Sequence, residues 1–437
     1  RRVLFRSDWT HKGQTPEQIL AGDVIRPAPN IKWPISERQI TLKIMKPQVL
    51  QDSEYKDMAI FKDYEKKTNV HLEWNCPPSA NFKDQFNLVV NSGADMPDII
   101  IAPQPEEVER LGQQGIFMAW NDYLQYMPNL EAAFEKYPYA RKAVYSDDGK
   151  MYSLPFIYQF VSGNNVMMIR QDWLDALKLQ MPTTTDEWYN VLKAFKTQDP
   201  NGNKENDEWP FSGYGPNGTG MNLGARSLIA AWGVTDQGDG FYAAEKLYPK
   251  DNKIHYGPTE DRYREGLEWV AKLYSEKLID PEILTNDDKA FQAKALSNTI
   301  GAWRGWINGD MKVLNDSALE ADKNTKFAVR EAPIMKGPYG DQIHPYADNN
   351  VLTNGMVMTK SNKYPKETAI WADYWYSEYG QTYVQGIEGL TYTIDSNGQP
   401  QWTDWVKNNP DGKTMNEVRG MVTFGRSAWP TVFSPWS

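Results

Sequence analysis

The chain has 437 residues, which is too long for one ordinary core and predicts two domains of roughly 150–200 residues each. Its formal net charge is -10, and it has no run of Lys or Arg, which argues against nucleic acid or an anionic membrane as a partner. A single Cys excludes an intrachain disulfide framework, and no apolar run reaches the ~18 residues of a membrane span.

The first 35 residues are interpreted as lying outside the folded part of the chain. Residues 1–7 resemble a translated sequencing adapter and are taken as an artefact. The segment after them carries Pro27, Pro29 and Pro34 and shows no periodicity, which is typical of an extended linker.

Residues 40–101 predict a strand–helix–strand–helix–strand order. Alternating apolar residues indicate strands, and apolar residues at three- and four-residue spacing indicate helices. The predicted strands are 40–45, 70–74 and 97–101, and the predicted helices are 55–67 and 82–92. This order predicts a parallel sheet with right-handed crossovers.

A second α/β region begins near residue 154. Its predicted elements are a strand at 167–169, a helix at 171–178, a second helix that ends at 195, an amphipathic helix around 263–274, and a strand at 299–303. Residues 183–186 supply N-cap candidates for the second helix. The chain ends without a capped final helix, and we expect a C-terminal truncation.

Residues 199–208 carry oxygen-bearing side chains at alternate positions, a spacing that suits Ca²⁺, which takes six to eight oxygen ligands. The predicted ligands are the side chains of Asp199, Asn201, Asn203 and Asp207, the backbone carbonyl of Glu205, and a bidentate Glu208. The loop departs from an EF-hand at Lys204, where Gly is expected, and at Pro210, where Glu is expected. The alternative is a solvated turn, because Asp, Asn, Pro and Gly also make turns.

Aromatic residues are unusually abundant, with 17 Trp and 24 Tyr in a chain of mean hydropathy -0.66. Indole and phenol rings combine an apolar face with a polar edge, which suits the recognition of sugar rings. The alternative is that many of these rings are ordinary core or boundary residues.

Five segments resemble, in their order, the extracellular oligosaccharide-binding proteins of bacterial ABC importers, and in particular the lipoprotein-type group that includes the alginate-binding periplasmic proteins. The segments are 92–98, 148–155, 169–174, 273–282 and 386–392. The resemblance implies an α/β, two-lobe periplasmic-binding-protein (Venus-flytrap) fold with a ligand cleft between the lobes. It implies lobe 1 at 36–155 plus 300–358, and lobe 2 at 156–299 plus 359–437. It also implies that the 199–208 loop holds a structural calcium ion.

The same resemblance suggests sugar-binding residues beside the points where the chain crosses between lobes. Trp303 and Trp306 are candidate stacking platforms, and Arg304 and Asn308 are candidates for binding hydroxyls. Further candidates are Tyr158, Gln159 and Asn164 at the first crossing, Glu388 and Tyr392 after a Gly-rich turn, and Trp232. The alternatives are interface packing for the Trp residues, hinge hydrogen bonding for the first-crossing residues, and a solvated loop for Glu388.

We therefore expect a non-enzymatic substrate-binding component of an ABC importer. Its partners are an oligosaccharide and membrane permease subunits, and it is expected to be an extracellular, lipid-anchored monomer. A glycoside hydrolase is the alternative, because 57 acidic residues always offer a pair of carboxylates. Hydrolase and phosphate-binding motifs are missing from the sequence, and the four His are scattered. With Arg304 as the one candidate cation, a neutral or mildly acidic plant polysaccharide fragment is favoured over an anionic one.

Overall fold

The computed structural model describes residues 11, 13–49, 52–158, 165–214, 225–234, 247–250, 252–343, 351–396, 400–413, 415–423 and 429–433. The chain divides into two compact units. Unit 1 contains residues 1–160 and 349–437, and unit 2 contains residues 161–348. Unit 2 is thus a single continuous segment inserted into unit 1.

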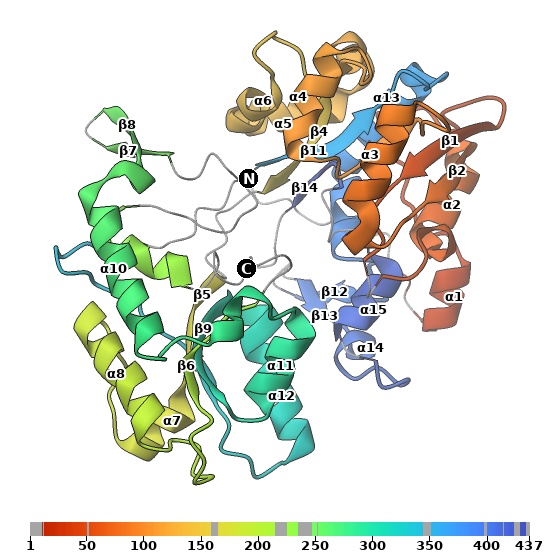
Figure 1. Cartoon of the computed structure of the whole chain (residues 1–437). Helices are drawn as coiled ribbons and strands as arrows, with labels where there is room; N and C mark the ends of the chain where they lie inside the picture. The colour runs from red at the N-terminus through yellow and green to blue at the C-terminus, as the bar shows by residue number, and fades with distance from the viewer. Residues whose placement is uncertain are drawn as a thin grey trace. The chain divides into compact units, whose positions relative to one another are not determined.

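Unit 1 is built on a six-stranded mixed sheet (Figure 1). In spatial order its strands are β14 (Thr431–Phe433), β4 (Ser153–Tyr158), β11 (Val351–Met358), β3 (Ile99–Ile101), β1 (Ile40–Met45) and β2 (Val70–Asn75). β1 is parallel to β2 and β3, as predicted, and β14 is parallel to β4, whereas β11 is antiparallel to both of its neighbours.

Helices cover both faces of this sheet, because alternate strand residues point to opposite sides. In β3, Ile99 and Ile101 join one core, while Ile100 joins a second core with Phe86 and Val90. The helices of unit 1 are α1 (Pro16–Ala21), α2 (Ala59–Thr68), α3 (Phe82–Ser92), α4 (Pro105–Gln113), α5 (Pro128–Lys136), α6 (Pro138–Val144), α13 (Pro365–Asp373), α14 (Asp404–Lys407) and α15 (Met415–Val422). A hairpin of β12 (Tyr392–Ile394) and β13 (Pro400–Trp402) lies outside the main sheet.

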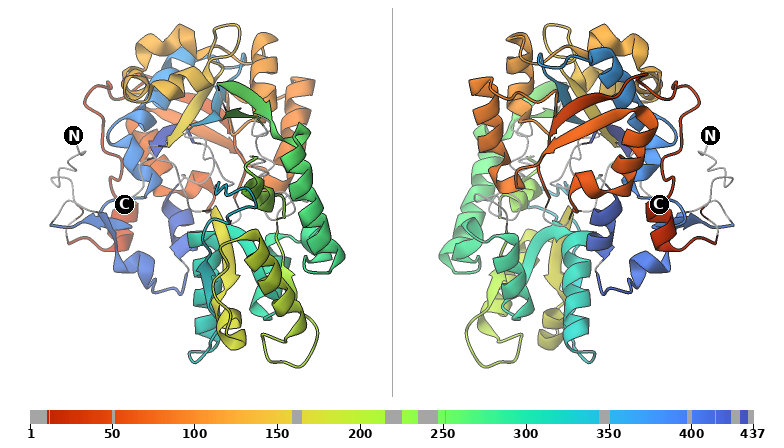
Figure 2. Two further views of the ribbon diagram at one scale, coloured as in Figure 1. Left: turned by 90° about the vertical axis from the view of Figure 1, so that its left-hand side faces the viewer. Right: turned by 90° about the vertical axis from the view of Figure 1, so that its right-hand side faces the viewer.

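Unit 2 is built on a four-stranded sheet with the order β10 (Val329–Glu331), β5 (Asn165–Arg170), β9 (Ile300–Trp306) and β6 (Trp209–Phe211). Its helices are α7 (Gln171–Leu177), α8 (Thr185–Thr197), α10 (Asp261–Ser275), α11 (Asp288–Leu296) and α12 (Lys312–Ala321). A 3₁₀ segment, η5 (Ala225–Trp232), packs with α10, and β7 (Leu247–Lys250) and β8 (Lys253–Tyr256) form a separate hairpin. α7 and α8 lie on one face of the sheet, and α11 and α12 lie on the other (Figures 1 and 2).

The start of α8 shows how local sequence sets an element. The Thr184 hydroxyl accepts from the backbone N–H of Glu187, and the Glu187 carboxylate accepts from the backbone N–H of Thr184. This capping box satisfies donors that the first turn of a helix leaves without partners. Trp188 and Leu192 then face the core, as their spacing predicted.

The expected lobe boundaries are wrong after residue 299. Residues 300–306 form β9, which pairs with β5 and β6 and therefore belongs to unit 2. The second crossing lies near residue 348, and the segment 359–437 returns to unit 1, where β14 completes the sheet. Trp303 and Trp306 therefore do not lie beside a crossing, contrary to the prediction for both.

The interpretation of residues 1–35 as artefact and linker is also wrong in part. α1 begins at a Thr15 capping box, and Ile19, Val24 and Ile25 are buried in the core of unit 1. The backbone N–H groups of Val24 and Ile25 both donate to the Asp63 carboxylate, at 2.8 and 2.6 Å. Residues 1–7, the suspected artefact, lie outside the described residues.

Candidate binding surface and metal loop

The edge of the unit 2 sheet that contains the end of β9 brings together several polar and aromatic groups. β9 and β6 are parallel, so Trp306 and the residues after Phe211 lie at the same edge. Antiparallel β5 begins at that edge with Asn165, which pairs with Trp306. In open α/β sheets, ligands bind outside the carboxyl ends of the strands, so this edge is a candidate site.

Trp306 is held at this edge by Asp310. Its backbone N–H donates to Asp310 Oδ2 at 2.5 Å, and the Tyr214 hydroxyl donates to Asp310 Oδ1 at 2.6 Å. A Cβ at Gly305 would lie 2.4 Å from Asp310 Oδ2, so a larger residue there would displace the Asp310 carboxylate. The Trp306 side chain is 38% exposed, and no other described Trp is as exposed as this.

Trp303 and Arg304 are more buried than the sequence suggested. Trp303 is fully buried, with its ring centroid 5.3 Å from that of Phe291, so no face of its ring is available for a sugar. This placement does not fit the stacking role expected for Trp303. Arg304 is 2% exposed and pairs with Met167 of β5. Residues opposite each other in an antiparallel pair share a face, so Arg304 and Trp306 lie on the face of Met167 and Asn165.

Many of the Trp side chains have a structural role, which is the alternative that the composition left open. Seven Trp side chains are among the largest fully buried groups, namely Trp120, Trp173, Trp188, Trp303, Trp371, Trp375 and Trp429. In unit 1 three of them form edge-to-face and tilted contacts with Phe61 and Tyr64. Such aromatic clusters bury large apolar areas in few residues.

Two other candidates are also packed. Trp232 is 5% exposed, and its ring centroid is 5.5 Å from that of Trp269 in the core of unit 2. Tyr158 is half-buried at the end of β4, with its ring centroid 4.7 Å from that of Phe156 and 5.8 Å from that of Phe433. Gln159 and Asn164 lie outside the described residues, as does the side chain of Asn308.

Glu388 and Tyr392 belong to unit 1, whereas Arg304 and Trp306 belong to unit 2. Glu388 is half-buried and forms a bridge with Tyr392, which is 3% exposed. Burial raises the pKa of the Tyr392 hydroxyl, so it remains a neutral hydrogen-bonding group.

The 199–208 loop connects α8 to β6 and is tightly wound. The side chains of Asn201 and Asn203 both donate to the Asp207 carboxylate, at 3.1–3.2 Å. Lys204, which replaces the EF-hand glycine, has a φ of 68°, so it takes the left-handed conformation that Gly adopts readily. The backbone N–H of Lys204 donates to Asp199 Oδ2 at 3.0 Å.

Two carboxylate oxygens of this loop are buried without hydrogen-bond partners among the described residues, namely Asp199 Oδ1 and Glu208 Oε1. Glu208 is 1% exposed, and burial, together with the charges of Asp207 and Asp199, raises its pKa. Buried carboxylate oxygens without donors fit a bound cation. Within the described part of the chain, no three His, Cys, Asp or Glu side chains are gathered closely enough to hold a metal ion. A cation here would therefore also depend on Asn201, Asn203 and the carbonyl of Glu205.

Sequence reasoning missed Asn165, Tyr214 and Asp310 as members of the candidate surface. Tyr214 and Asp310 meet although 96 positions separate them, so no local pattern marks the pair. A polar Asn at the start of an otherwise apolar strand was the one available signal for Asn165.

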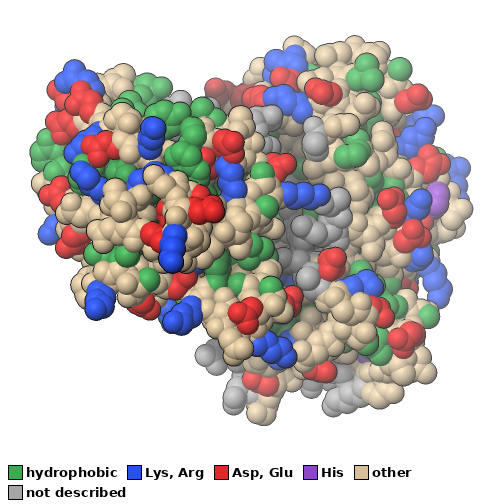
Figure 3. Space-filling model, turned by 60° about the horizontal axis from the view of Figure 1, so that its bottom comes forward, with side chains coloured by type: hydrophobic (Ala, Val, Ile, Leu, Met, Phe, Trp, Pro, Cys, Tyr) green, Lys and Arg blue, Asp and Glu red, His purple; other side chains and the backbone are tan. Residues whose placement is uncertain are grey.

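Charges are mixed over the face of the molecule that Figure 3 presents, where basic and acidic side chains are interspersed. This pattern agrees with the absence of a basic run in the sequence. Among the described helices, none combines the length and apolarity that crossing a membrane requires.

The chain belongs to the bacterial extracellular solute-binding protein family, whose model matches residues 49–382. The family comprises binding proteins and not enzymes, which supports the binding interpretation over the hydrolase alternative.

Among its relatives is FusA of Streptococcus pneumoniae serotype 4, a fructooligosaccharide ABC transporter substrate-binding protein, which is 31% identical over 79% of this chain and 63% of FusA. The chain therefore spans less than two thirds of that relative. Lipoprotein LipO of Bacillus subtilis (strain 168) is 27% identical over 89% of this chain and 73% of LipO.

Two solved structures share the fold. The FusA EF-hand mutant in complex with fructo-nystose matches with a TM-score of 0.72 at 27% identity, over 90% of this chain and 78% of that one. The alginate-binding protein AlgQ2 without calcium ion matches with a TM-score of 0.75 at 26% identity, over 92% of this chain and 79% of that one. The two-lobed α/β solute-binding fold predicted from the resemblance is thereby confirmed.

Proposed function

We propose that this protein is the substrate-binding component of an ABC importer and captures an oligosaccharide. The observation that carries the proposal is its similarity, over 90% of the chain, to FusA in complex with fructo-nystose. In periplasmic binding proteins as a class, two domains close around the ligand by hinge motion.

On unit 2, the sugar ring stacks on the exposed face of Trp306, whose backbone is fixed by Asp310. Stacking uses the apolar C–H face of a sugar and leaves its hydroxyls for polar groups. On unit 1, Glu388 accepts from sugar hydroxyls, since a carboxylate offers two acceptor oxygens. With one candidate guanidinium, at Arg304, we favour a neutral or mildly acidic plant oligosaccharide.

The test is calorimetric titration of the chain with a panel of plant and algal oligosaccharides, followed by chromatography of the same samples. We expect heat of binding with at least one member of the panel and recovery of the intact sugar. Recovery of shortened products would favour the hydrolase alternative, and no binding across the panel would contradict the proposed function.

We further propose that residues 199–208 hold a structural Ca²⁺ ion. The ligands are the side chains of Asp199, Asn201, Asn203, Asp207 and Glu208 and the carbonyl of Glu205. The ion would balance carboxylates that are otherwise buried together and would fasten the connection between α8 and β6.

The native protein is proposed to work outside the cell as a lipid-anchored monomer beside its permease subunits. The similarity to a lipoprotein of Bacillus subtilis supports the anchor. Light scattering with and without ligand tests the monomer, for which a single molecular mass of 50.1 kDa is expected.

A further inference from the structure

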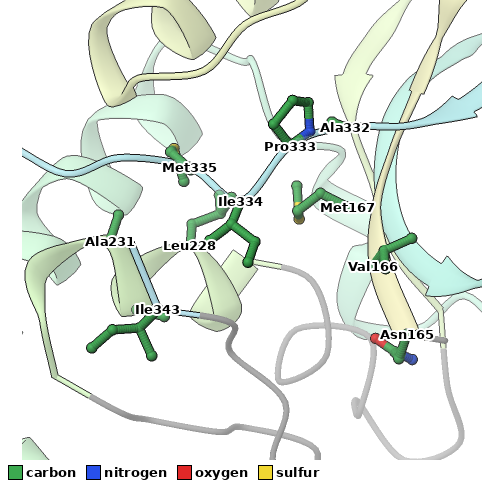
Figure 4. Close-up of a pocket in the computed structure, with 11 residues that line it drawn as sticks. Asn165, Val166, Met167, Leu228, Ala231, Ala332, Pro333, Ile334, Met335 and Ile343 are labelled. Atoms are coloured by element: carbon green, nitrogen blue, oxygen red, sulfur yellow. The ribbon is translucent and has the colours of Figure 1, made fainter. Parts of the chain in front are cut away.

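Unit 2 contains a small apolar pocket (Figure 4), and one of its lining residues, Asn165, also belongs to the candidate binding surface. The start of β5, the segment η5 and the chain after β10 form its walls. Residues that line it include Asn165, Met167, Leu228, Ala231, Ile334 and Met335. All of these described residues belong to unit 2.

The pocket has a volume of about 40 Å³. Since a water-sized group needs about 10–15 Å³ of such space, three heavy atoms fit, as many as the acetyl part of an acetamido group has, with the amide nitrogen at the pocket entrance; a pyranose ring does not fit. Leu228 and Ala231 at its base are 1% and 3% exposed, whereas Ile334 is 40% exposed. A small group can therefore enter beside Ile334 and come to rest against apolar walls.

Among the lining residues that the structure describes, Asn165 supplies the one polar side chain. It is 1% exposed, and its Oδ1 has no hydrogen-bond partner among the described residues. Leaving a buried acceptor without a donor costs stability, so its retention here calls for an explanation. A ligand that brings an N–H or O–H donor into the pocket provides one.

The pocket and the candidate stacking residue lie on the same face of the sheet. Asn165 pairs with Trp306, and Met167 pairs with Arg304, in the antiparallel register of β5 and β9. Opposite residues in such pairs have Cβ atoms about 4.5–5.5 Å apart on one face. A substituent of a ring stacked on Trp306 is therefore within reach of Asn165.

We propose that this pocket is a subsite for the acetamido substituent of an amino sugar. The amide N–H of the substituent donates to Asn165 Oδ1, and its methyl group packs against Met167, Leu228 and Met335. An O-acetyl ester lacks the donor, and a hydroxyl lacks the methyl group, so the acetamido group matches both features of the pocket. The proposal rests on the oligosaccharide-binding function proposed above.

The test uses the full chain with ¹³C-methyl methionine, because Met167 and Met335 place reporters in the pocket wall. Their NMR signals are assigned by Met→Leu substitution. The probe is methyl 2-acetamido-2-deoxy-glucoside, and methyl glucoside, which has a hydroxyl in place of the acetamido group, is the control. Since a fragment of this size binds with a Kd on the order of 10 mM, the titration extends about tenfold above that value.

We expect the acetamido probe to shift both methyl signals and methyl glucoside to leave them unchanged. Asn165→Leu, which keeps the volume but removes the acceptor, weakens the response about tenfold or more, since a site built to hydrogen-bond a group discriminates strongly against its loss. Its melting temperature does not fall, because a buried acceptor without a donor has been removed.

Ala332→Leu fills the pocket and abolishes the shifts, whereas Ala318→Leu on α12 preserves them; both positions are 9% exposed, but only Ala332 lines the pocket. Unmoved methyl signals at the highest probe concentration, or an unchanged response in Asn165→Leu, would overturn the proposal.

If an oligosaccharide without acetamido groups binds while these signals stay unmoved, the proposed function stands and the subsite fails. If the probe shifts them but no oligosaccharide binds, the subsite stands and the proposed function fails.

Discussion

Trp303 and Trp306 are close neighbours in β9 but have opposite environments. Trp303 pairs with Met168 and enters the core beneath α11, while Trp306 ends the strand and keeps an exposed face. From residue type alone, both were predicted to stack on a sugar ring. The distinction depends on which face of the sheet each residue occupies, which a one-residue change of register would reverse.

We predict that Trp306→Ala weakens oligosaccharide binding roughly 30-fold, or about 2 kcal/mol, because it removes an aromatic anchor. Its melting temperature should change little, since the side chain is partly exposed. Trp303→Ala is the matched comparison and should cost about 3–5 kcal/mol of unfolding free energy through the cavity it leaves. Calorimetry and denaturant unfolding of both variants measure this, and equal affinity in Trp306→Ala and the unaltered protein would contradict it.

Lys46 is buried at the carboxyl end of β1. Its Nζ donates to the Tyr55 hydroxyl at 2.6 Å, and that hydroxyl donates to Asp52 Oδ2 at 2.9 Å. Burial lowers the pKa of Lys46 to about 7, although the charge of Asp52 acts in the opposite direction. The ammonium form is therefore disfavoured in the folded state.

This lowered pKa makes stability depend on pH. Between pH 7 and about 10 the unfolded chain binds a proton at Lys46 that the folded chain has lost, so the free energy of unfolding rises with pH in this window. Lys46→Met should reduce the slope between pH 7 and 9, as measured by urea unfolding at each pH. Lys43→Met on the same strand is exposed and serves as a control that keeps the slope. An identical slope in Lys46→Met would refute the assignment.

At the scale of elements, the sequence predicted local structure well where a segment contains its own signal. β1, β2, α3 and α8 follow from periodicity and caps, and α3 begins and ends at the expected residues. β11 and β14 were not predicted. These segments are strands because they pair with β4, whose residues lie about 200 to 280 positions away. The predicted parallel sheet was correct for β1 to β3, and β11 makes the whole sheet mixed.

The candidate site was only partly predictable for the same reason. The 199–208 loop carries its chemistry in consecutive residues, whereas the surface around Trp306 is assembled from β5, β9 and the residue Tyr214. The pairing of Asn165 with Trp306 depends on the register of β5 against β9, which neither segment's sequence indicates by itself.

The start of α5 is fixed by a side chain from α13. The Asp373 carboxylate accepts from the backbone N–H and the side-chain amide of Asn129 and from the backbone N–H of Leu130, at 2.7–3.2 Å. These contacts satisfy donors that the first turn of a helix leaves free. Burial nevertheless raises the pKa of Asp373 to about 6.

The pH dependence that Asp373 gives to the free energy of unfolding has the opposite sign to that given by Lys46. Between pH 4 and 6 the folded state holds a proton that the unfolded chain has released, so the contribution of Asp373 to unfolding free energy falls as pH rises. Asp373→Asn should flatten this part of the stability profile, as followed by circular dichroism during urea unfolding. Asp186→Asn, an exposed position in the first turn of α8, should leave the profile unchanged. An unaltered decline between pH 4 and 6 in Asp373→Asn would contradict the prediction.

At the scale of the whole molecule, calcium should stabilise the folded chain by mass action, by about 2.7 kcal/mol at one hundred times its Kd. A chelator should therefore lower the melting temperature. Asp207→Ala should remove this sensitivity with little change in sugar affinity. Glu205→Ala should retain it, because only its backbone carbonyl is a proposed ligand. A melting curve unaffected by chelator would instead support a solvated turn.

Unit 2 has a complete sheet and its own core, so we predict that residues 161–348 fold alone. A single cooperative thermal transition, measured by circular dichroism, would support this. Residues 1–160 alone should show no such transition, because β11 and β14 are missing from their sheet. Cooperative melting of both fragments would refute the distinction.

Because unit 2 is inserted between β4 and β11, these two strands of one sheet are synthesised at widely separated times. β11 must enter between β3 and β4, yet it leaves the ribosome only after all of unit 2. At roughly 5–20 residues per second, the apolar edges of β3 and β4 wait on the order of ten seconds or more for their partner. During that interval the nascent chain presents unpaired strand edges to other chains, and a chaperone that holds the first 160 residues would protect it when it is most prone to aggregate.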